Sequence, residues 1–268
     1  DLAMDSIEQA VGNYAKNYHQ VDQLYRSYGY HSSKSNQATL LDKLTELVEK
    51  HYSNNFLLKL NDRFQRLLDE ESAWPTEGLD HQRDFFKQCV SPFLTEKKKL
   101  FVVISDALRY EVAQELNRRI LEQDRFSSEL EWRVSTLPSY TQLGMAALLP
   151  HQTLEVDPTN GDVLADGMST KGLEARKKVL DANAGVKTTA ILAKDFLKMN
   201  SNQEGRELTR EHDLIYVFHN GIDAAGDKLT TQHKTFEAVE NEFETLLAIL
   251  KKIASVNGNN TLVTADHG

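Results

Sequence analysis

Six side chains that could bind cations or attack an ester stand at widely separated points of the chain. They are Asp106, Thr136, Asp223, Asp227, Asp266 and His267. Carboxylates and imidazoles are ligands for divalent metals, and a hydroxyl close to such a cation loses its proton more readily and becomes a nucleophile. Carboxylates crowded together without a cation would repel one another at neutral pH. The set therefore predicts metal-assisted cleavage of a phosphate ester, in which two metals hold the attacking and leaving oxygens.

The elements expected to position these side chains alternate between strands and helices. Short apolar or β-prone runs predict strands at 100–104, 130–134, 188–192, 214–218 and 261–263. Amphipathic stretches predict helices at 108–123, 141–149, 171–182, 194–200 and 233–254, and residues 151–170 predict loops with a short hairpin. Such alternation is typical of an α/β domain with a largely parallel sheet covered by helices on both faces. Ligands of such sheets bind outside the carboxyl ends of the strands, where four of the strand runs deliver the six side chains.

The front of the chain has a different pattern. Residues 1–95 carry apolar side chains at helical spacing, as in Phe56, Leu60, Phe64 and Leu67, and no long alternation with period two. We therefore expect an all-helical N-terminal region over 1–95, followed by the α/β domain over 96–268.

Composition limits the classes of function. The 268 residues include 31 basic and 40 acidic side chains, which gives a net charge of −9. A dedicated nucleic-acid-binding module normally has a basic excess, although an enzyme that acts on nucleic acid is not excluded, because bound metals reverse the local charge. The single cysteine, Cys89, fits a reducing compartment, so we expect a cytoplasmic protein. No apolar run reaches the roughly 18 residues of a membrane span.

Both ends of the chain suggest a piece of a longer protein. The chain begins with Asp1 and stops at Gly268, directly after an expected strand. We expect the α/β domain to be truncated at its C-terminal end.

Each candidate side chain alone also has a simpler interpretation. Asp106 would cap a following helix, Thr136 would be a turn residue, and 266–268 would form a tight turn. Asp223 and Asp227 would be a helix cap and a first-turn acid. Their ordered appearance at successive strand ends favours a shared site.

Four segments resemble one protein family. The segment 264–268 (TADHG) resembles the Asp-His-Gly signature of the alkaline-phosphatase superfamily, and 103–109 (VISDALR) resembles its first metal-binding strand. The segment 135–141 (STLPSYT) resembles the nucleophile segment, and 165–170 (ADGMST) is also similar to PglZ proteins. Over about 95–268 the chain thus resembles the PglZ domain of BREX (bacteriophage exclusion) defence systems, which implies an alkaline-phosphatase-like fold.

The resemblance also implies roles for the candidate residues. Asp106, Asp266 and His267 would hold one metal, with Thr136 as the bridging nucleophile and its neighbour Ser135 as the competitor for that role.

The second metal would be held by Asp223 and Asp227. Phosphodiesterase members of the superfamily have a histidine where this chain has Asp227, so Zn²⁺, Mn²⁺ and Mg²⁺ all stay open as the metal. A further histidine is expected beyond residue 268, so we expect this stretch alone to be weakly active or inactive.

The implied function is a metal-dependent phosphohydrolase or phosphodiesterase of phage defence. Other BREX proteins would be its partners, a phosphodiester such as DNA its substrate, and no membrane is implied. The alternative is a catalytically weak scaffold or interaction subunit of the defence complex. A mutase or phosphotransferase would need a serine nucleophile and phosphosugar-binding arginines, for which Arg109 and Arg133 are the candidates.

Overall fold

The computed structural model describes residues 2, 4–35, 38–71, 74, 78–222 and 232–267, with the backbone alone at 38–40 and 232–234. These residues form two compact units. The first lies within 1–79, 110–132 and 225–240, and the second lies within 80–109, 133–224 and 241–268. The boundary at residue 95 that the sequence predicts stays a prediction.

The first unit is helical, as the sequence predicts for the front of the chain. Its elements are α1 (Ile7–Asn13), the π-helical turn η1 (Tyr14–Tyr18), α2 (His19–Lys34), α3 (Ala38–Lys50), the π-helical η2 (His51–Leu57), α4 (Leu58–Glu70), α6 (Tyr110–Leu121) and the first residues of α12 (Gln232–Ser255). Ser6 begins the first helix, because its hydroxyl accepts a hydrogen bond of 3.1 Å from the backbone N–H of Gln9. The rings of Tyr25 and Tyr52 stack at 3.8 Å.

A buried set of ion pairs lies inside this unit. The Arg26 cluster consists of Arg26, Glu111, Glu115, Arg119 and Glu240. The guanidinium of Arg26 bonds all three carboxylates, at 3.1 Å to Glu111 and 2.7 Å to Glu240, with Glu115 the closest. Arg119 bonds Glu115 and lies 2.7 Å from Glu240. Every charged group of the cluster therefore has a partner of opposite charge.

The second unit is built on a parallel sheet, which confirms the predicted α/β fold class. The described strands of this sheet are β1 (Leu100–Ser105), β5 (Thr188–Leu192), β6 (Leu214–His219) and β7 (Thr261–Thr264), in the order β5-β6-β1-β7. All three pairings are parallel, with Ile104 opposite Phe218 and Thr264. Strands β1 and β6 are buried along their whole length, as expected for unbroken apolar runs.

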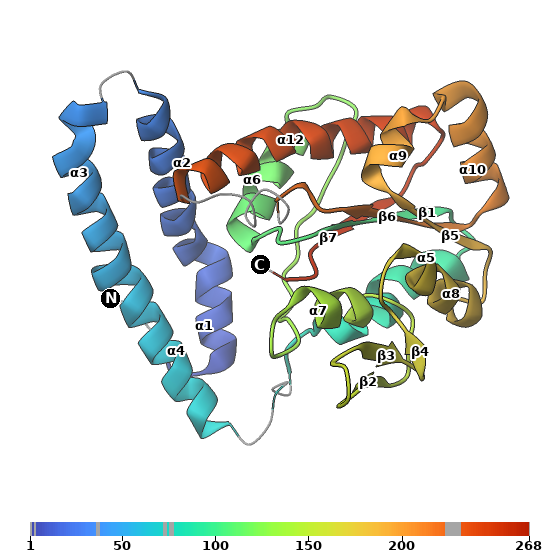
Figure 1. The fold of residues 1–268 in the computed structure, drawn as a ribbon, viewed down its shortest axis with the longest axis horizontal. Helices are drawn as coiled ribbons and strands as arrows, with labels where there is room; N and C mark the ends of the chain where they lie inside the picture. Colours follow the sequence, from blue (N-terminus) through green and yellow to red (C-terminus); the bar gives the residue numbers. More distant parts are fainter. Residues whose placement is uncertain are drawn as a thin grey trace. The chain divides into compact units, whose positions relative to one another are not determined.

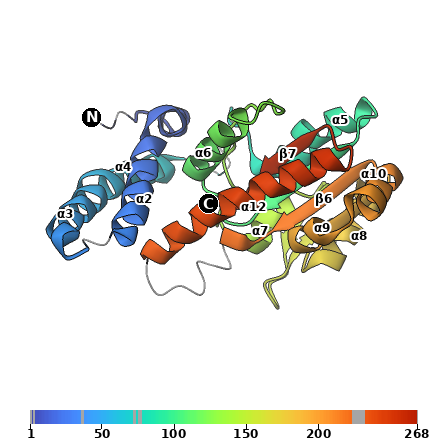
Figure 2. The same ribbon diagram turned by 90° about the horizontal axis from the view of Figure 1, so that it is seen from above.

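Helices cover both faces of this sheet (Figures 1 and 2). One face, which carries Val102, Ile104 and Phe218, packs in a common core with Leu148 and Leu180. The elements on that side are the 3₁₀ turn η3 (Gln82–Asp84), the π-helical η4 (Phe86–Val90), α5 (Ser91–Thr95), α7 (Thr141–Ala147) and α8 (Leu173–Asn183). The other side has α9 (Ala193–Lys198), the π-helical η5 (Ser201–Gly205), α10 (Arg206–Glu211) and the part of α12 from residue 241 onward.

Two details differ from the sequence prediction. Residues 130–134 do not form a strand, and Val134 alone makes an isolated parallel bridge, to His81. The alternation of apolar and charged residues in 130–134 favours a strand, but a strand also needs a continuous neighbour, and the described part of the chain offers only this one bridge. The predicted hairpin of 151–170 is a three-stranded antiparallel sheet of β2 (Leu154–Val156), β3 (Val163–Ala165) and β4 (Met168–Ser169).

Candidate metal centre

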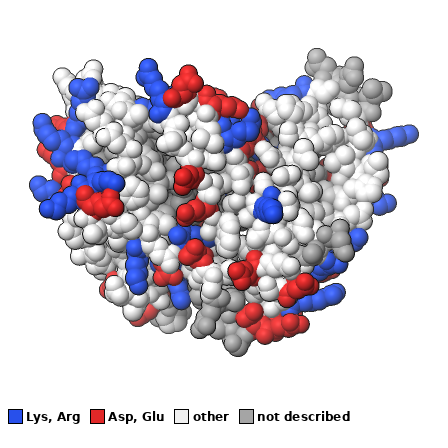
Figure 3. Space-filling model, turned by 180° about the vertical axis from the view of Figure 1, so that it is seen from behind, with Lys and Arg blue, Asp and Glu red and all other residues white. Residues whose placement is uncertain are grey.

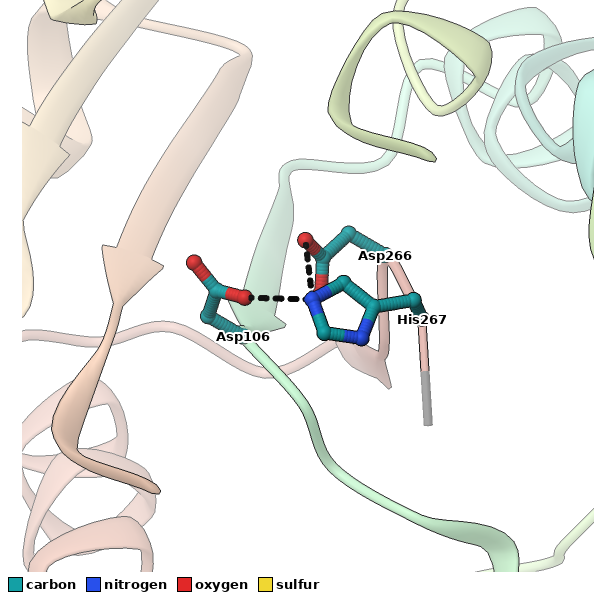
Figure 4. A group of neighbouring side chains, drawn as sticks. All are labelled: Asp106, Asp266 and His267. Carbon is teal, nitrogen blue, oxygen red and sulfur yellow. Dashed lines mark ion pairs between the residues drawn. The ribbon is translucent and has the colours of Figure 1, made fainter. Parts of the chain in front are cut away.

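Two carboxylates meet at the carboxyl edge of the parallel sheet. Asp106 directly follows β1, and Asp266 lies two residues after β7, the neighbour of β1. Both side chains are buried, Asp266 almost completely. Neighbouring parallel strands end at the same edge, and this brings two residues 160 positions apart in sequence into one site (Figure 4).

The ring of His267 completes a group of three. Its Nε2 atom lies 3.2 Å from Asp106 Oδ1 and 3.7 Å from Asp266 Oδ2. One ligand atom from each of the three side chains lies within 4.8 Å of the others, and no other such group occurs among the described residues. The hydroxyl of Thr141, at the start of α7, lies 3.1 Å from the same ring nitrogen.

The oxygens that face His267 lack hydrogen-bond donors. Asp106 Oδ1 and Asp266 Oδ2 are buried, and neither accepts a hydrogen bond within the described part of the chain. Buried polar atoms are normally paired, because an unpaired one costs roughly 1–3 kcal/mol. Burial, and then the neighbouring carboxylate of Asp266, raise the pKa of Asp106 to about 7, against the opposing effect of His267 and Arg176.

A divalent cation fits this donor set. Two carboxylate oxygens and one imidazole nitrogen are ligands of the kind that Zn²⁺ and Mn²⁺ accept. A cation would satisfy the orphaned oxygens and remove the repulsion between the two carboxylates. Asp106, Asp266 and His267 would hold it.

The backbone next to Asp106 is unusual. Ala107 has φ +59°, a left-handed conformation that costs a residue with a side chain roughly 1–2 kcal/mol. In this conformation its N–H donates a 3.2 Å hydrogen bond to Asp266 Oδ1. Strain of this kind collects at functional sites. The next helix, α6, begins only at Tyr110, four residues after Asp106, so Asp106 is not at the N-cap position of that helix.

A glycine allows α7 to approach Asp266. A methyl group built on Gly144 would lie 2.0 Å from the backbone oxygen of Asp266. No side chain fits in that space, so Gly144 is required for the present position of α7 against the site.

Thr136 is connected to the same strand end by a glutamine. Its N–H and its hydroxyl donate to Gln82 Oε1 at 3.3 and 3.2 Å. The Nε2 group of Gln82 donates to the carbonyls of Ala265 and Asp266 at 3.0 and 2.5 Å. Gln82 thus bridges the predicted nucleophile and the segment that carries Asp266 and His267. Ser135, the alternative nucleophile, is half-buried beside Thr136.

Another hydrogen-bond chain lies behind the site, on the α12 face of the sheet. The buried ring of His219, the last residue of β6, is 2.9 Å from the hydroxyl of Ser105 and 2.9 Å from a carboxylate oxygen of Glu242. The hydrogen bond from His219 lowers the pKa of Glu242. The carbonyl of His219 also accepts from the N–H of Asp106 at 2.8 Å. His219 therefore fixes the end of β1, from which Asp106 projects.

The remaining predicted ligands, Asp223 and Asp227, lie outside the described residues. The structure thus brings together three of the six predicted side chains directly, and connects a fourth, Thr136, through Gln82.

Sequence reasoning missed several contributors. Gln82, Thr141, Gly144 and Glu242 come from helical turns whose position over the sheet is not encoded in a local pattern. One signal was present for Arg176, a further neighbour of the site: it stands at helical spacing from Leu173, Val179 and Leu180, so a charge interrupts an apolar helix face.

The fold and the site together define a class of protein: an α/β domain with a candidate metal centre at the carboxyl edge of its parallel sheet. Residues 85–268 match the family described as the BREX system PglZ alkaline phosphatase-like domain. Because this match covers more than half of the chain, the chain belongs to that family.

Two curated relatives are similar over almost the whole chain. The alkaline phosphatase-like protein BrxZ of Escherichia coli O9:H4 (strain HS) is 41% identical over 264 residues. The alkaline phosphatase-like protein PglZ of Bacillus cereus (strain H3081.97) is 34% identical over 260 residues. Each alignment covers 95% of this chain but 30% of the relative. In the part of the chain that the structure describes, no helix has the length and apolar character needed to span a membrane.

Proposed function

We propose that this chain carries one metal site and the nucleophile of a metal-dependent phosphohydrolase or phosphodiesterase of BREX phage defence. The observation that carries the proposal is the pair of buried carboxylate oxygens, Asp106 Oδ1 and Asp266 Oδ2, that face His267 without a hydrogen-bond donor. Membership in the PglZ family supports it, and because the chain spans 30% of its relatives, activity, substrate and partners of the whole protein belong to the proposal.

In this proposal Asp106, Asp266 and His267 hold one divalent cation, and Asp223 and Asp227 contribute to a second. Zn²⁺, Mn²⁺ and Mg²⁺ are the candidate ions. When bound, such ions lower the pKa of a nearby hydroxyl and neutralise charge on a phosphoryl group.

Thr136 is the proposed nucleophile. Its oxygen would form a bond to phosphorus while the ester oxygen leaves, and water would then release the phosphate. Gln82 supports this role, because it accepts from both the N–H and the hydroxyl of Thr136 and so limits the directions that the hydroxyl can take. Gln82 is in turn anchored on the carbonyls of Ala265 and Asp266.

The proposed substrate is a phosphate ester, and a nucleic acid is the less supported choice. The chain has a net charge of −9. On the face shown in Figure 3, the described acidic and basic side chains are interspersed and form no broad basic surface. Other BREX proteins are the proposed partners. The cytoplasm is the proposed compartment, because the single Cys89 fits a reducing environment.

The test uses the full-length protein with Mn²⁺ or Zn²⁺ and bis-p-nitrophenyl phosphate. We expect turnover that Thr136→Ala and Asp106→Ala abolish, whereas the matched variant Ser135→Ala keeps most of it. Loss in Ser135→Ala with activity retained in Thr136→Ala would move the nucleophile to Ser135. If the metal-loaded protein turns over no phosphate ester, the chain is instead part of a scaffold subunit of the defence complex.

A further inference from the structure

Arg176 is a charged side chain on the face of α8 that packs against the sheet. It precedes the fully buried Val179 and Leu180 by one helical turn. Its guanidinium carbon lies 4.9 Å above the centre of the Phe218 ring. Phe218 is the penultimate residue of β6 and pairs with Ile104, two residues before Asp106. Arg176 is therefore held near the sheet edge where the site lies.

Arg176 and the two carboxylates of the site belong to the same side of the sheet. Ile104 and Leu262 pack into the core that contains Phe218. Side chains alternate between the two faces of a strand, so Asp106 and Asp266 continue the rows of Ile104 and Leu262. Burial lowers the pKa of Arg176, and the charges of Asp106 and Asp266 act on it in the opposite direction. The guanidinium and the carboxylates thus interact electrostatically, yet form no direct ion pair among the described residues.

Within the described part of the chain, the guanidinium forms a hydrogen bond to the protein through Nε alone. Its Nε–H donates a 3.1 Å hydrogen bond to the carbonyl of Thr170. Within the described residues, neither terminal nitrogen donates to another protein group. A guanidinium has five N–H donors, and those on the terminal nitrogens form the fork that binds carboxylate and phosphate oxygens.

The acceptor for Nε is itself firmly held. Thr170 is buried, and both its N–H and its hydroxyl donate to the carbonyl of Val163 on β3, at 3.2 and 2.8 Å. Asp166, in the turn between β3 and β4, anchors that turn to the segment before β2, because its carboxylate accepts from the N–H groups of Gln152 and Thr153. The segment 165–170, which the sequence singled out, thereby fixes the orientation of Arg176.

We propose that Arg176 binds a phosphoryl oxygen of the substrate at the site formed by Asp106, Asp266 and His267. This inference rests on the proposed function and names the residue that recognises the anion. A fixed cation beside metal-binding carboxylates opposes metal binding by charge repulsion. Its position is useful when a phosphate group lies between the guanidinium and the metal and interacts with both.

The test measures binding and requires no turnover. Full-length protein loaded with Mn²⁺ is titrated with inorganic phosphate by calorimetry, as wild type, Arg176→Gln and Arg176→Lys. We expect Arg176→Gln to weaken phosphate binding by roughly tenfold to a hundredfold, the range of a charged hydrogen bond. Arg176→Lys should recover part of the loss, because it restores the charge without the fork. The exposed Arg210→Gln serves as the matched control and should leave phosphate affinity unchanged.

The same titration with Mn²⁺ distinguishes the alternative, in which Arg176 only balances the charge of Asp106 and Asp266. In that case Arg176→Gln would bind Mn²⁺ more tightly and phosphate as well as the wild type does, and this result would overturn the inference. Absence of phosphate binding to the metal-loaded wild type would also overturn it. If phosphate binding depends on Arg176 but no phosphate ester is cleaved, the anion site stands and the proposed enzymatic function fails. Should Arg176→Gln fail to fold, the Arg176→Lys titration decides.

Discussion

The two units of the molecule handle buried carboxylates in opposite ways. In the first unit, Glu111 and Glu115 lie against the guanidinium of Arg26. Burial raises the pKa of Glu115, but Arg119 and Arg26 more than offset this, so the pKa falls below its usual range. In the second unit, Asp106 and Asp266 face each other with orphaned oxygens, and the pKa of Asp106 rises to about 7.

This difference separates a structural charge cluster from the candidate metal centre. Where the chain supplies all partners, a buried carboxylate holds helices together. Where the protein supplies no hydrogen-bond donor, the carboxylate oxygens remain able to bind a cation from solution, at a cost to the stability of the fold. Both groups contain buried carboxylates, so the partners supplied to those carboxylates carry the distinction.

The largest expected effect is on the Arg26 cluster. Arg26→Met removes the guanidinium that pairs with Glu111, Glu115 and Glu240, and removal of one partner of a buried ion pair costs about 3–5 kcal/mol. We expect the free energy of unfolding to fall by that amount in a denaturant titration. The exposed Arg210, paired with Glu207, gives the control: Arg210→Met should change it by less than about 0.5 kcal/mol. Equal effects of the two variants would show that the cluster does not stabilise the helices.

A smaller effect is expected at the contact of α7 with the candidate metal centre. In Gly144→Ala, the added methyl group would lie 2.0 Å from the backbone oxygen of Asp266, so the backbone must shift. We expect a loss of about 1–3 kcal/mol in stability and weaker Mn²⁺ binding in calorimetry. Gly12→Ala is the control, since nothing lies within 4 Å of its added methyl and alanine favours a helix interior by roughly 1 kcal/mol. A Gly144→Ala protein with unchanged Mn²⁺ affinity would contradict the proposed fit of α7 to the site.

The smallest effect concerns pH and Glu115. Its folded-state pKa lies below the ordinary value of 4.5, so it contributes stability that is fully present above about pH 4.5. That contribution is lost as the pH falls through the lowered pKa. We expect unfolding temperatures to decline more steeply below pH 4.5 in the wild type than in Glu115→Gln. Parallel curves would mean that Glu115 titrates normally in the folded protein.

The sequence predicted the sheet and the meeting of its strand ends for one physical reason. The unbroken apolar run 100–104 is typical of a buried parallel strand, and neighbouring parallel strands end at the same carboxyl edge of the sheet. The proximity of Asp106 and Asp266 could therefore be predicted from the sequence alone. Val134 shows the limit of such reasoning, because a strand-like pattern does not reveal whether a partner strand exists.

The parts that hold the site could not be predicted in the same way. Gln82 and Glu242 are ordinary polar residues of helical turns, and their roles arise from how those elements pack on the sheet. Gly144 is a small residue in a helix, which by itself indicates neither a contact nor a direction. These contacts depend on how elements distant in the sequence pack together, and local periodicity in the sequence does not indicate that packing.

The most direct test of the central claim compares the wild type with Asp106→Asn in Mn²⁺ calorimetry and thermal unfolding of the full-length protein. The account predicts that Asp106→Asn weakens Mn²⁺ binding roughly a hundredfold or more, since loss of a ligand costs at least as much as loss of its supporting contacts. Without metal, the variant should unfold at the same or a higher temperature than the wild type, because the repulsion from Asp266 is gone. An Asp106→Asn protein that binds Mn²⁺ as tightly as the wild type and unfolds earlier without it would contradict the account.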